Sequence, residues 1–321
     1  MKTISVVTPC FNEELNVARC HEAVKALFEG ELKGFLREHI FCDNASSDNT
    51  PAILREIAKK DDSVRVILNA RNFGPLRSTF NGVLATRGDA VLLFLPADLQ
   101  DPPELIPRFV SLWQEGYEVV YGIRQQRDER WLMRSVRKLY YRVLTSLSDL
   151  SVPPNVGDFQ LVDRRVVDAM RQIEDAYPFM RMMTFECGFK SIGVPYQWQA
   201  RRRGFSKNSL GRLVDQGMNG LVTFTTMPVR FVLFAGFSIA GLSILYAFGT
   251  IVVSLIHFRE LAPPGIPTII VALFFFGGVQ LFVIGLLGEY ILAIYSQVRR
   301  KPLVFERERI NFGPSGKAAE H

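Results

Sequence analysis

Apolar and polar positions alternate in a regular way over the first third of the chain. Short runs rich in Val, Ile and Leu are typical of buried strands, and each ends in a polar turn that leads into apolar residues at helical spacing. Four strand–helix repeats in this order predict an α/β fold with a doubly wound, mostly parallel, Rossmann-like sheet. The predicted strands are residues 4–9, 39–42, 64–68 and 91–95, and the predicted helices are residues 17–28, 51–60, 75–87 and 103–115.

The pattern changes beyond a further predicted strand at residues 118–121. Residues 131–147 carry one apolar stripe with Arg and Lys beside it and a Trp at its start, which is typical of a helix lying on a membrane surface. Packing of this helix on the sheet is the alternative. Residues 209–228 form a second amphipathic segment. Between the two we expect helices at 166–173 and 179–185 and a strand at 193–199.

Two long runs without a formal charge follow, at residues 231–256 and 267–288. Each exceeds the roughly 20 residues needed to cross a bilayer, so both predict transmembrane helices, the second continuing to about residue 294. Arg230 precedes the pair and a basic cluster at 299–301 follows it, so the positive-inside rule places both ends in the cytosol. The chain is therefore predicted to be a multi-pass integral membrane protein.

These segments divide the chain into four predicted parts. Residues 1–208 form a cytosolic α/β domain, and residues 209–228 form an interface helix. Residues 229–298 hold the two transmembrane helices, at about 231–256 and 267–294, and residues 299–321 form a basic cytosolic tail.

Composition adds limits to this picture. The net charge of +6 is unevenly spread, with basic residues gathered after residue 124, around 201–212 and near 299–309. Four cysteines without a CxxC spacing, in a chain without a recognisable secretory signal, predict reduced and mostly buried thiols with no metal or redox role. A basic surface alone would suit nucleic acid, but the membrane-type helices beside it favour lipid phosphate as the partner.

The predicted strand at 91–95 ends in a stretch that combines acids, an amide and prolines, Pro96-Ala97-Asp98-Leu99-Gln100-Asp101-Pro102-Pro103-Glu104. A buried strand that delivers acids at its C-terminal end is how an open α/β sheet builds a ligand crevice. Oxygen ligands such as Asp98 and Gln100 suit Mg²⁺ or Mn²⁺, which in turn suit diphosphates. The alternative is a strand end with a solvated Asp turn and a proline stop.

Polar turns also follow the other predicted strands. Each turn alone has a structural explanation, and Asn12, for example, is a good helix N-cap. Because the C-terminal ends of parallel strands meet at one edge of a sheet, the agreement of all these turns favours a ligand site. The candidate nucleotide-lining residues are Asn12 and Glu13 after the first strand, Asp43 and Ser46 after the second, and Asn72 and Gly74 after the third.

Two later segments carry candidate chemistry. Asp158 follows Gly157 in a predicted loop, where a carboxylate can approach a ligand closely, and a turn or N-cap acid is the alternative. The basic loop Arg203-Gly204-Phe205-Ser206-Lys207 can grip phosphates, and a solvated basic turn is the alternative.

The order of these motifs resembles the family-2 glycosyltransferases of GT-A fold, and within them the polyprenyl-phosphate sugar transferases. Dolichyl-phosphate mannose synthase and the bactoprenol glucosyltransferases are of this type, and the two-helix C-terminal hairpin fits the second. The resemblance rests on Pro9, Asn12-Glu13-Glu14, Asp43 with Ser46 and Asp48, Asn72-Phe73-Gly74, Gly88-Asp89, Ala97 to Glu104, and Arg203-Gly204 with Ser206-Lys207.

Two departures from the family pattern stand out. Many relatives have Asp-Ala-Asp where this chain has Pro96-Ala97-Asp98, so only the second acid can be a metal ligand. The turn usually written Asp-Asp-Gly-Ser is here Asp43-Asn44-Ala45-Ser46, which leaves one carboxylate near the base.

The resemblance implies an inverting transfer of one sugar from a nucleotide sugar to a polyprenyl phosphate, on the cytosolic face of a bacterial inner membrane. Asp98 and Gln100 would hold Mg²⁺ or Mn²⁺, and Asp98, Asp158 and Arg203 would be catalytic. The acceptor phosphate would contact Arg124, Arg203, Ser206 and Lys207. The donor nucleotide would contact Pro9, Asn12, Glu13, Asp43, Ser46, Asn72, Gly74 and Ala97.

Glucose from UDP-glucose and undecaprenyl phosphate are the substrates expected by similarity to the bactoprenol enzymes. GDP-mannose or another nucleotide sugar is the alternative donor. The rival from another class is a membrane-tethered nucleotide-sugar binding protein without turnover. A processive polysaccharide synthase usually has more membrane spans than the two predicted here. The expected partners are the donor, the lipid acceptor and membrane lipids, with a homo-oligomer also possible and no nucleic acid.

Overall fold

The computed structural model describes residues 1–124, 156–175, 177–197, 265–298 and 301–313, together with positions 236, 238, 242 and 245. The chain divides into two compact units. The first comprises Met1–Lys138, Leu150–Lys207 and Arg300–His321, and the second comprises Leu139–Asp149 and Asn208–Arg299. The sheet described below belongs to the first unit, and the long helix near the C-terminus belongs to the second.

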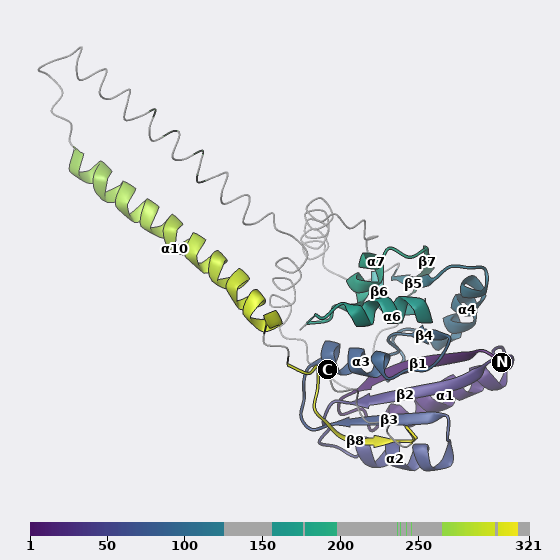
Figure 1. The fold of residues 1–321 in the computed structure, drawn as a ribbon. Helices are drawn as coiled ribbons and strands as arrows, with labels where there is room; N and C mark the ends of the chain where they lie inside the picture. Colours follow the sequence, from purple (N-terminus) through teal and green to yellow (C-terminus); the bar gives the residue numbers. More distant parts are fainter. Residues whose placement is uncertain are drawn as a thin grey trace, which may run out of the picture. The chain divides into compact units, whose positions relative to one another are not determined.

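The described strands form one mixed sheet in the order β7-β5-β6-β4-β1-β2-β3-β8 (Figure 1). The strands β4, β1, β2 and β3 are parallel neighbours, and β5 is parallel to β7. β6 runs antiparallel to β4 and β5, and β8 runs antiparallel to β3. The strands are β1 (Thr3–Cys10), β2 (Leu36–Asp43), β3 (Val64–Asn69), β4 (Ala90–Leu92), β5 (Val119–Arg124), β6 (Val156–Asp163), β7 (Ser191–Tyr196) and β8 (Glu306–Ile310).

The helices of this unit cover both faces of the sheet. Helices α1 and α2 pack together, and α1 also contacts the turn η1 that leads into α4. On the other face α3 packs on α6, and α6 packs on α7. The helices are α1 (Val17–Glu29), α2 (Thr50–Lys60), α3 (Pro75–Leu84), η1 (Pro103–Leu105), α4 (Ile106–Gln114), α6 (Arg164–Gln172) and α7 (Met180–Glu186).

The core follows from side chains that alternate along the strands. Ile4 and Val6 of β1 are fully buried in the cluster that includes Val17 of α1 and Phe109 of α4. The opposite face is as tightly packed, because a Cβ at Gly82 of α3 would lie 2.2 Å from the Cys42 sulfur. Glycine at this position lets α3 lie directly on the sheet. The order of strands and helices in this region confirms the predicted strand–helix repeats.

The four cysteines are free, with Cys10, Cys20 and Cys42 buried and Cys187 half-buried. Burial, the largest cause, raises the pKa of the Cys20 thiol to about 12. This agrees with the prediction of mostly buried thiols.

The strand β6 was not predicted. It inserts between β4 and β5 with antiparallel pairing, so the sheet is less parallel than the sequence indicated. Its apolar residues Phe159, Leu161 and Val162 are fully buried, which gives this strand a place in the centre of the sheet.

The C-terminal segment also differs from its prediction as part of a basic tail. Residues 306–310 form β8, which adds to the free edge of β3. Arg55 of α2 binds Glu308 at 2.7 Å, and Asn81 of α3 donates to Glu306 at 2.6 Å. The end of the chain is therefore part of the same sheet as its beginning (Figure 1).

The long helix α10 (Gly265–Val298) belongs to the second unit. Within it, residues 275–292 have a mean hydropathy of 1.7 and none of this window is buried. In the part of the chain that the structure describes, it is the one helix long and apolar enough to cross a membrane. The predicted helices at 131–147, 209–228 and 231–256 lie outside the described residues, apart from four helical positions in the last, so the hairpin stays a prediction.

Candidate active site

The polar turns predicted from the sequence meet at one edge of the sheet. Strands β4, β1, β2 and β3 are parallel and adjacent, so their C-terminal ends lie side by side. The turns that follow them carry Asp98, Asn12, Asp43 and Asn72 in this spatial order. The prediction that these turns share one edge is confirmed.

The turn after β1 is tied to the turn after β2 by a two-way exchange of hydrogen bonds. The Asn12 backbone N–H donates to the Ser46 hydroxyl at 2.8 Å, and the Asn12 side-chain oxygen accepts from the Ser47 N–H at 2.8 Å. Asn12 has a φ of 57°, a left-handed conformation that asparagine tolerates better than most residues. The prediction of Asn12 as an N-cap is wrong, because α1 begins only at Val17.

Glu13 and Glu14 extend the same link. The Glu13 N–H donates to the Thr50 hydroxyl at 2.9 Å, and the Glu14 N–H donates to Asp48 at 3.2 Å. The Glu13 carboxylate accepts from the Asn16 amide at 2.6 Å. Side chains that follow β2 therefore accept hydrogen bonds from the backbone N–H groups of the turn after β1. These bonds hold the two turns together.

Asp43 lies at the end of β2 and is almost fully buried. Its carboxylate accepts from both the backbone N–H and the hydroxyl of Ser46. Burial, the largest cause, raises the pKa of Asp43 above its usual range, although the bonds from Ser46 oppose the shift. Ser46 therefore fixes the orientation of the carboxylate that the sequence predicts to line the nucleotide.

Three asparagines bridge the turns after β2 and β3. The Asn44 amide donates to the Asn72 side-chain oxygen at 3.0 Å, and the Asn44 oxygen accepts from Asn69 at 3.2 Å and from the Phe73 N–H at 2.9 Å. The Gly74 N–H donates to Asn72 at 2.9 Å, and Gly74 has a φ of 89°, which glycine adopts without strain. Asn44 and Asn69 were not predicted, although amides just past strand ends were a signal for them.

The loop that follows β4 carries Asp98, Gln100 and Asp101, and we call it the acid loop. Its backbone is strained next to Asp98. Leu99 has a φ of 56°, a conformation that costs roughly 1–2 kcal/mol for a residue with a Cβ. The Gln100 N–H donates to the Asp98 carboxylate at 3.3 Å, so the turn holds both predicted metal ligands close together. Strain of this kind is concentrated at functional sites.

The predicted metal ligands fit a small hard cation. Mg²⁺ is usually held by one or two carboxylates and completed by water and substrate phosphates, so Asp98 and Gln100 are a sufficient protein contribution. Among the described residues no group of three or more His, Cys, Asp or Glu side chains could hold a metal by itself.

A buried charge cluster lies directly behind the acid loop. The fully buried Asp101 carboxylate accepts from the Arg124 guanidinium at 3.0 and 3.1 Å. The Tyr196 hydroxyl also donates to Asp101, and it accepts from Arg124 Nε at 3.0 Å. Arg124, a predicted acceptor ligand, is thus held in an ion pair, while Asp101 and Tyr196 were not predicted as site residues.

Asp158 is in strand β6, and its predicted loop position is wrong. Its carboxylate receives two bonds from Arg181 of α7, at 2.6 and 3.2 Å, in the forked geometry typical of arginine and carboxylate. The strand places Asp158 more firmly than a loop would. Its position beside the reacting sugar stays a prediction.

The remaining predicted residues divide into two groups. Pro9 lies near the end of β1, and the side chain of Ala97 is 4% exposed and belongs to the core. Arg203, Ser206 and Lys207 lie outside the described residues.

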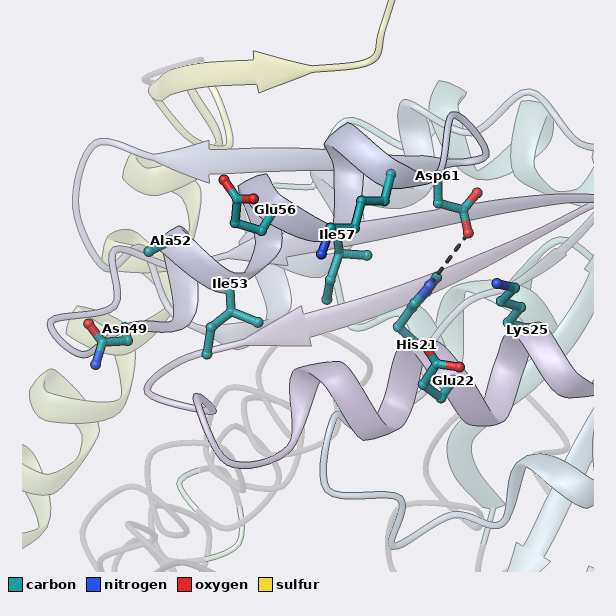
Figure 2. A pocket seen from close by; sticks show the side chains of 10 residues that line it. His21, Glu22, Lys25, Asn49, Ala52, Ile53, Glu56, Ile57 and Asp61 are labelled. Carbon is teal, nitrogen blue, oxygen red and sulfur yellow. Dashed lines mark ion pairs between the residues drawn. The ribbon is translucent and has the colours of Figure 1, made fainter.

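A groove lies between α1 and α2, away from the predicted residues (Figure 2). Figure 2 shows Ile53 and Ile57 of α2 along it and the His21–Asp61 pair at its end, with 3.5 Å between nitrogen and oxygen. None of its lining residues is a predicted site residue. Burial, the largest cause, lowers the pKa of His21, and the charge of Asp61 opposes this shift.

Comparison with known families identifies the class of enzyme to which the chain belongs. A model described as glycosyl transferase family 2 matches residues 5–171, which include β1 to β4 and the acid loop. The chain belongs to the family 2 glycosyl transferases.

Relatives of this glycosyltransferase match most of its length. A Bacillus subtilis (strain 168) protein named "Uncharacterized glycosyltransferase YkcC" is 34% identical over 93% of this chain and 91% of its own. The "Bactoprenol glucosyl transferase" of Shigella phage SfX is 34% identical over 95% of this chain and 99% of its own.

Solved structures match less closely. Glucosyl-3-phosphoglycerate synthase from Mycobacterium tuberculosis, in complex with phosphoglyceric acid, is 22% identical over 69% of this chain and 78% of its own, with a TM-score of 0.45. A match at this level carries no argument about substrate.

Proposed function

We propose that this glycosyltransferase moves a single glucose from UDP-glucose to undecaprenyl phosphate, with inversion, on the cytosolic face of a bacterial membrane. One observation carries the proposal. The bactoprenol glucosyl transferase of phage SfX is similar over 95% of this chain, well beyond residue 171 where the family match ends. Similarity confined to the sugar-transfer domain would support the class of reaction only. Similarity that extends beyond this domain also supports the same kind of acceptor.

The reaction is a displacement at the anomeric carbon. An oxygen of the lipid phosphate attacks that carbon, the bond from the carbon to the diphosphate oxygen breaks, and UDP leaves with the bonding electrons. A phosphate monoester already carries a charge of about −1.5 to −2 near neutral pH, so it needs little help from a general base. The protein's main tasks are therefore positioning and neutralisation of charge.

The donor lies along the edge that β1, β2, β3 and β4 share. Uncharged groups from Asn12, Ser46 and Asn72 suit the base and ribose, which are themselves uncharged. Asp98 and Gln100 would hold Mg²⁺ or Mn²⁺, which would neutralise charge on the diphosphate when bound.

The sugar and the acceptor lie on the side of β5, β6 and β7. Asp158, held by two bonds from Arg181, stabilises positive charge that develops on the sugar ring. Arg203, Ser206 and Lys207 hold the incoming phosphate in line. Asp158→Asn should lower kcat about tenfold or more with little change in donor KM, and an unchanged kcat would remove Asp158 from this role.

The membrane location is supported by the topology of the sheet. The chain leaves the sheet after β7 and returns to it at β8, so any crossing of a membrane between them must be matched by a second one. The apolar window 275–292 of α10 suits one crossing, and the uncharged run 231–256 suits the other. The predicted hairpin would keep the lipid tail of the acceptor in the bilayer.

The test is a donor panel with the full-length protein in detergent or liposomes. UDP-glucose, UDP-galactose, GDP-mannose and UDP-N-acetylglucosamine are each supplied with undecaprenyl phosphate, with Mn²⁺ or with EDTA. We expect release of UDP from UDP-glucose that requires both the lipid phosphate and the metal. A preference for GDP-mannose would correct the donor, and nucleotide-sugar binding without release with any lipid phosphate would contradict the proposal.

A further inference from the structure

Two buried side chains and the half-buried Arg124, from distant parts of the sequence, meet beside the acid loop. Asp101 is fully buried and Tyr196 is 5% exposed. The Arg124 guanidinium binds both oxygens of Asp101, and the Tyr196 hydroxyl bridges the two by donating to Asp101 and accepting from Arg124. Each of the three side chains therefore forms hydrogen bonds with the other two. We call Asp101, Arg124 and Tyr196 the hub.

The neighbouring strands are shaped to hold the hub. A Cβ at Gly122 would lie 2.6 Å from the Tyr196 ring, so the glycine makes room for it. The ring also contacts Phe159 of β6, with 6.0 Å between centroids. A Cβ at Gly157 would lie 3.4 Å from Arg124 Nε, so this position too lets β6 pass close to the hub.

The hub joins three segments that carry predicted chemistry. Asp101 ends the loop that holds Asp98 and Gln100. Arg124 is the last residue of β5. Tyr196 is the last residue of β7, and the chain continues from it toward Arg203, Ser206 and Lys207. The hub therefore connects the segment predicted to bind the sugar donor with the segments predicted to bind the lipid phosphate acceptor.

Stability alone is a weak explanation for such a cluster. Burying a carboxylate and a guanidinium costs several kcal/mol of desolvation each, and their attraction repays it only in part, so apolar residues of similar size often stabilise a protein as well. A fixed geometry is what this arrangement provides and a packed apolar cluster does not, because each bond has a required direction.

We propose that Asp101 and Tyr196 are positioning residues that hold the acid loop in register with the acceptor side of the site. The proposal rests on the proposed function for the identity of the two substrates. Both side chains are buried, so in this role they act through the segments that they hold. A misplacement of about 1 Å at a reacting centre costs about 100-fold in rate, so loss of the hub should lower kcat even at saturating donor and acceptor.

The test compares the hub with a similar cluster at the opposite edge of the sheet. Glu38 is a buried carboxylate that binds Arg65 and accepts from the Ser5 hydroxyl. It lies near the start of β2, away from the candidate site. Asp101→Asn and Glu38→Gln make the same chemical change in the two clusters, and Tyr196→Phe removes only one hydroxyl from the hub.

Two measurements on the full-length variants separate positioning from stability. Hydrogen exchange of backbone amides is followed in peptides covering 93–105, 119–124 and 191–207, and in peptides covering β1 and β2. Transfer kinetics are measured with UDP-glucose and undecaprenyl phosphate, well below the melting temperature of every variant. We expect Asp101→Asn to speed exchange in the first group of peptides and to lower kcat about 100-fold.

Tyr196→Phe should show the same pattern with a smaller loss of about tenfold, because it removes the two hydrogen bonds of the hydroxyl and leaves the ion pair between Asp101 and Arg124 in place. Glu38→Gln should speed exchange only around β1 and β2 and leave kcat within about twofold of the starting protein. If Asp101→Asn leaves exchange of the acid loop and kcat unchanged, or affects kcat no more than Glu38→Gln, the proposal is wrong.

The exchange measurement keeps the two proposals apart. Faster exchange confined to the hub peptides in Asp101→Asn, with no transfer by the starting protein, would support the hub and contradict the proposed substrates. Normal transfer by the starting protein, with unchanged exchange and kinetics in Asp101→Asn, would support the substrates and remove the hub.

Discussion

The C-terminal edge of the sheet has two halves that are built differently. On the side of β1, β2 and β3 the turns are joined mainly by neutral hydrogen bonds, among them those of Asn12, Ser46 and Asn44. On the side of β5, β6 and β7 the side chains are joined by charge pairs, Asp101 with Arg124 and Asp158 with Arg181. The acid loop after β4 lies between the two halves.

The difference matches the chemistry expected on each side. A base and a ribose are uncharged, and neutral donors and acceptors bind them without a large cost of desolvation. The diphosphate, the lipid phosphate and the reacting sugar all carry or develop charge, and paired charges in a site of low dielectric act strongly on them. Changes on the charged side should therefore lower kcat, and changes on the neutral side should lower stability or the affinity for the donor.

The largest effect on transfer is expected from a change in the acid loop, which lies between the two halves. Asp98→Ala should lower transfer at least about 100-fold while the protein stays folded in the membrane, because it removes the one acid predicted to hold the metal. The control is Asp89→Ala, at the other end of β4, where the carboxylate accepts from the Thr3 N–H at 2.7 Å. Near-normal transfer by Asp98→Ala, or an equal loss in both variants, would refute the metal role.

At the start of β3, at the opposite end of that strand from the candidate site, Asn311 fastens the C-terminal segment. Its amide donates to the Ala58 carbonyl at 2.7 Å and the Val64 carbonyl at 2.9 Å, and its φ is 62°. Asn311→Ala should cost about 2 kcal/mol, from the lost bonds and from a left-handed Ala. Asn311→Gly keeps the backbone unstrained and should cost about half as much.

Melting temperatures of the three proteins in one detergent check this order. Transfer measured well below the melting temperatures should stay within about twofold in both variants, since Asn311 lies outside the charged half. A larger loss in Asn311→Gly than in Asn311→Ala would show that backbone strain is not part of the effect.

Asp43 is the buried acid of the neutral half, and it gives a pH dependence. Burial, the largest cause, raises its pKa above the ordinary value of 3.8, so the folded protein keeps this proton after the unfolded chain has lost it. The contribution of Asp43 to stability therefore falls as pH rises from about 3.8 through the raised pKa. Asp43→Asn removes this fall. The melting temperature of the variant should therefore rise relative to that of the starting protein as the pH increases across this window. A difference that is flat or falls with pH would contradict the shift.

The smallest effect is expected at Ala45, in the same turn. Its φ of 61° is a conformation that glycine adopts easily, and glycine is the residue found here in the usual family turn Asp-Asp-Gly-Ser. Relief of strain of roughly 1–2 kcal/mol is opposed by the greater freedom of glycine in the unfolded chain, roughly 0.4–1 kcal/mol. Ala45→Gly should therefore stabilise the protein by about 0.5–1 kcal/mol, seen as a small rise in melting temperature with transfer unchanged.

Most of the neutral half and the acid loop could be predicted from local sequence. Alternating apolar runs specify strands, polar turns end them, and parallel strands bring those turns to one edge whatever their separation along the chain. Asp98, Asp43 and Asn72 were predicted to lie at this edge for this reason. The boundaries of the elements and the N-cap role of Asn12 were not, because several turn conformations suit the same residues.

The charged half depended on the tertiary structure. Strand β6 enters the sheet antiparallel between β4 and β5, and only this insertion places Asp158 within reach of Arg181. In the same way, Asp101, Arg124 and Tyr196 come together only when β5 and β7 are paired beside the acid loop.

The amino-acid sequence by itself therefore determined the family, the strand–helix repeats and the acidic edge, because these follow from periodicity and local motifs. The three-dimensional fold decided which charges pair and that Glu306–Ile310 returns to β3 as β8. A strand of alternating charged residues has no local feature that specifies the strand with which it pairs. An ion pair between residues distant in the sequence depends on the packing of all the elements between them.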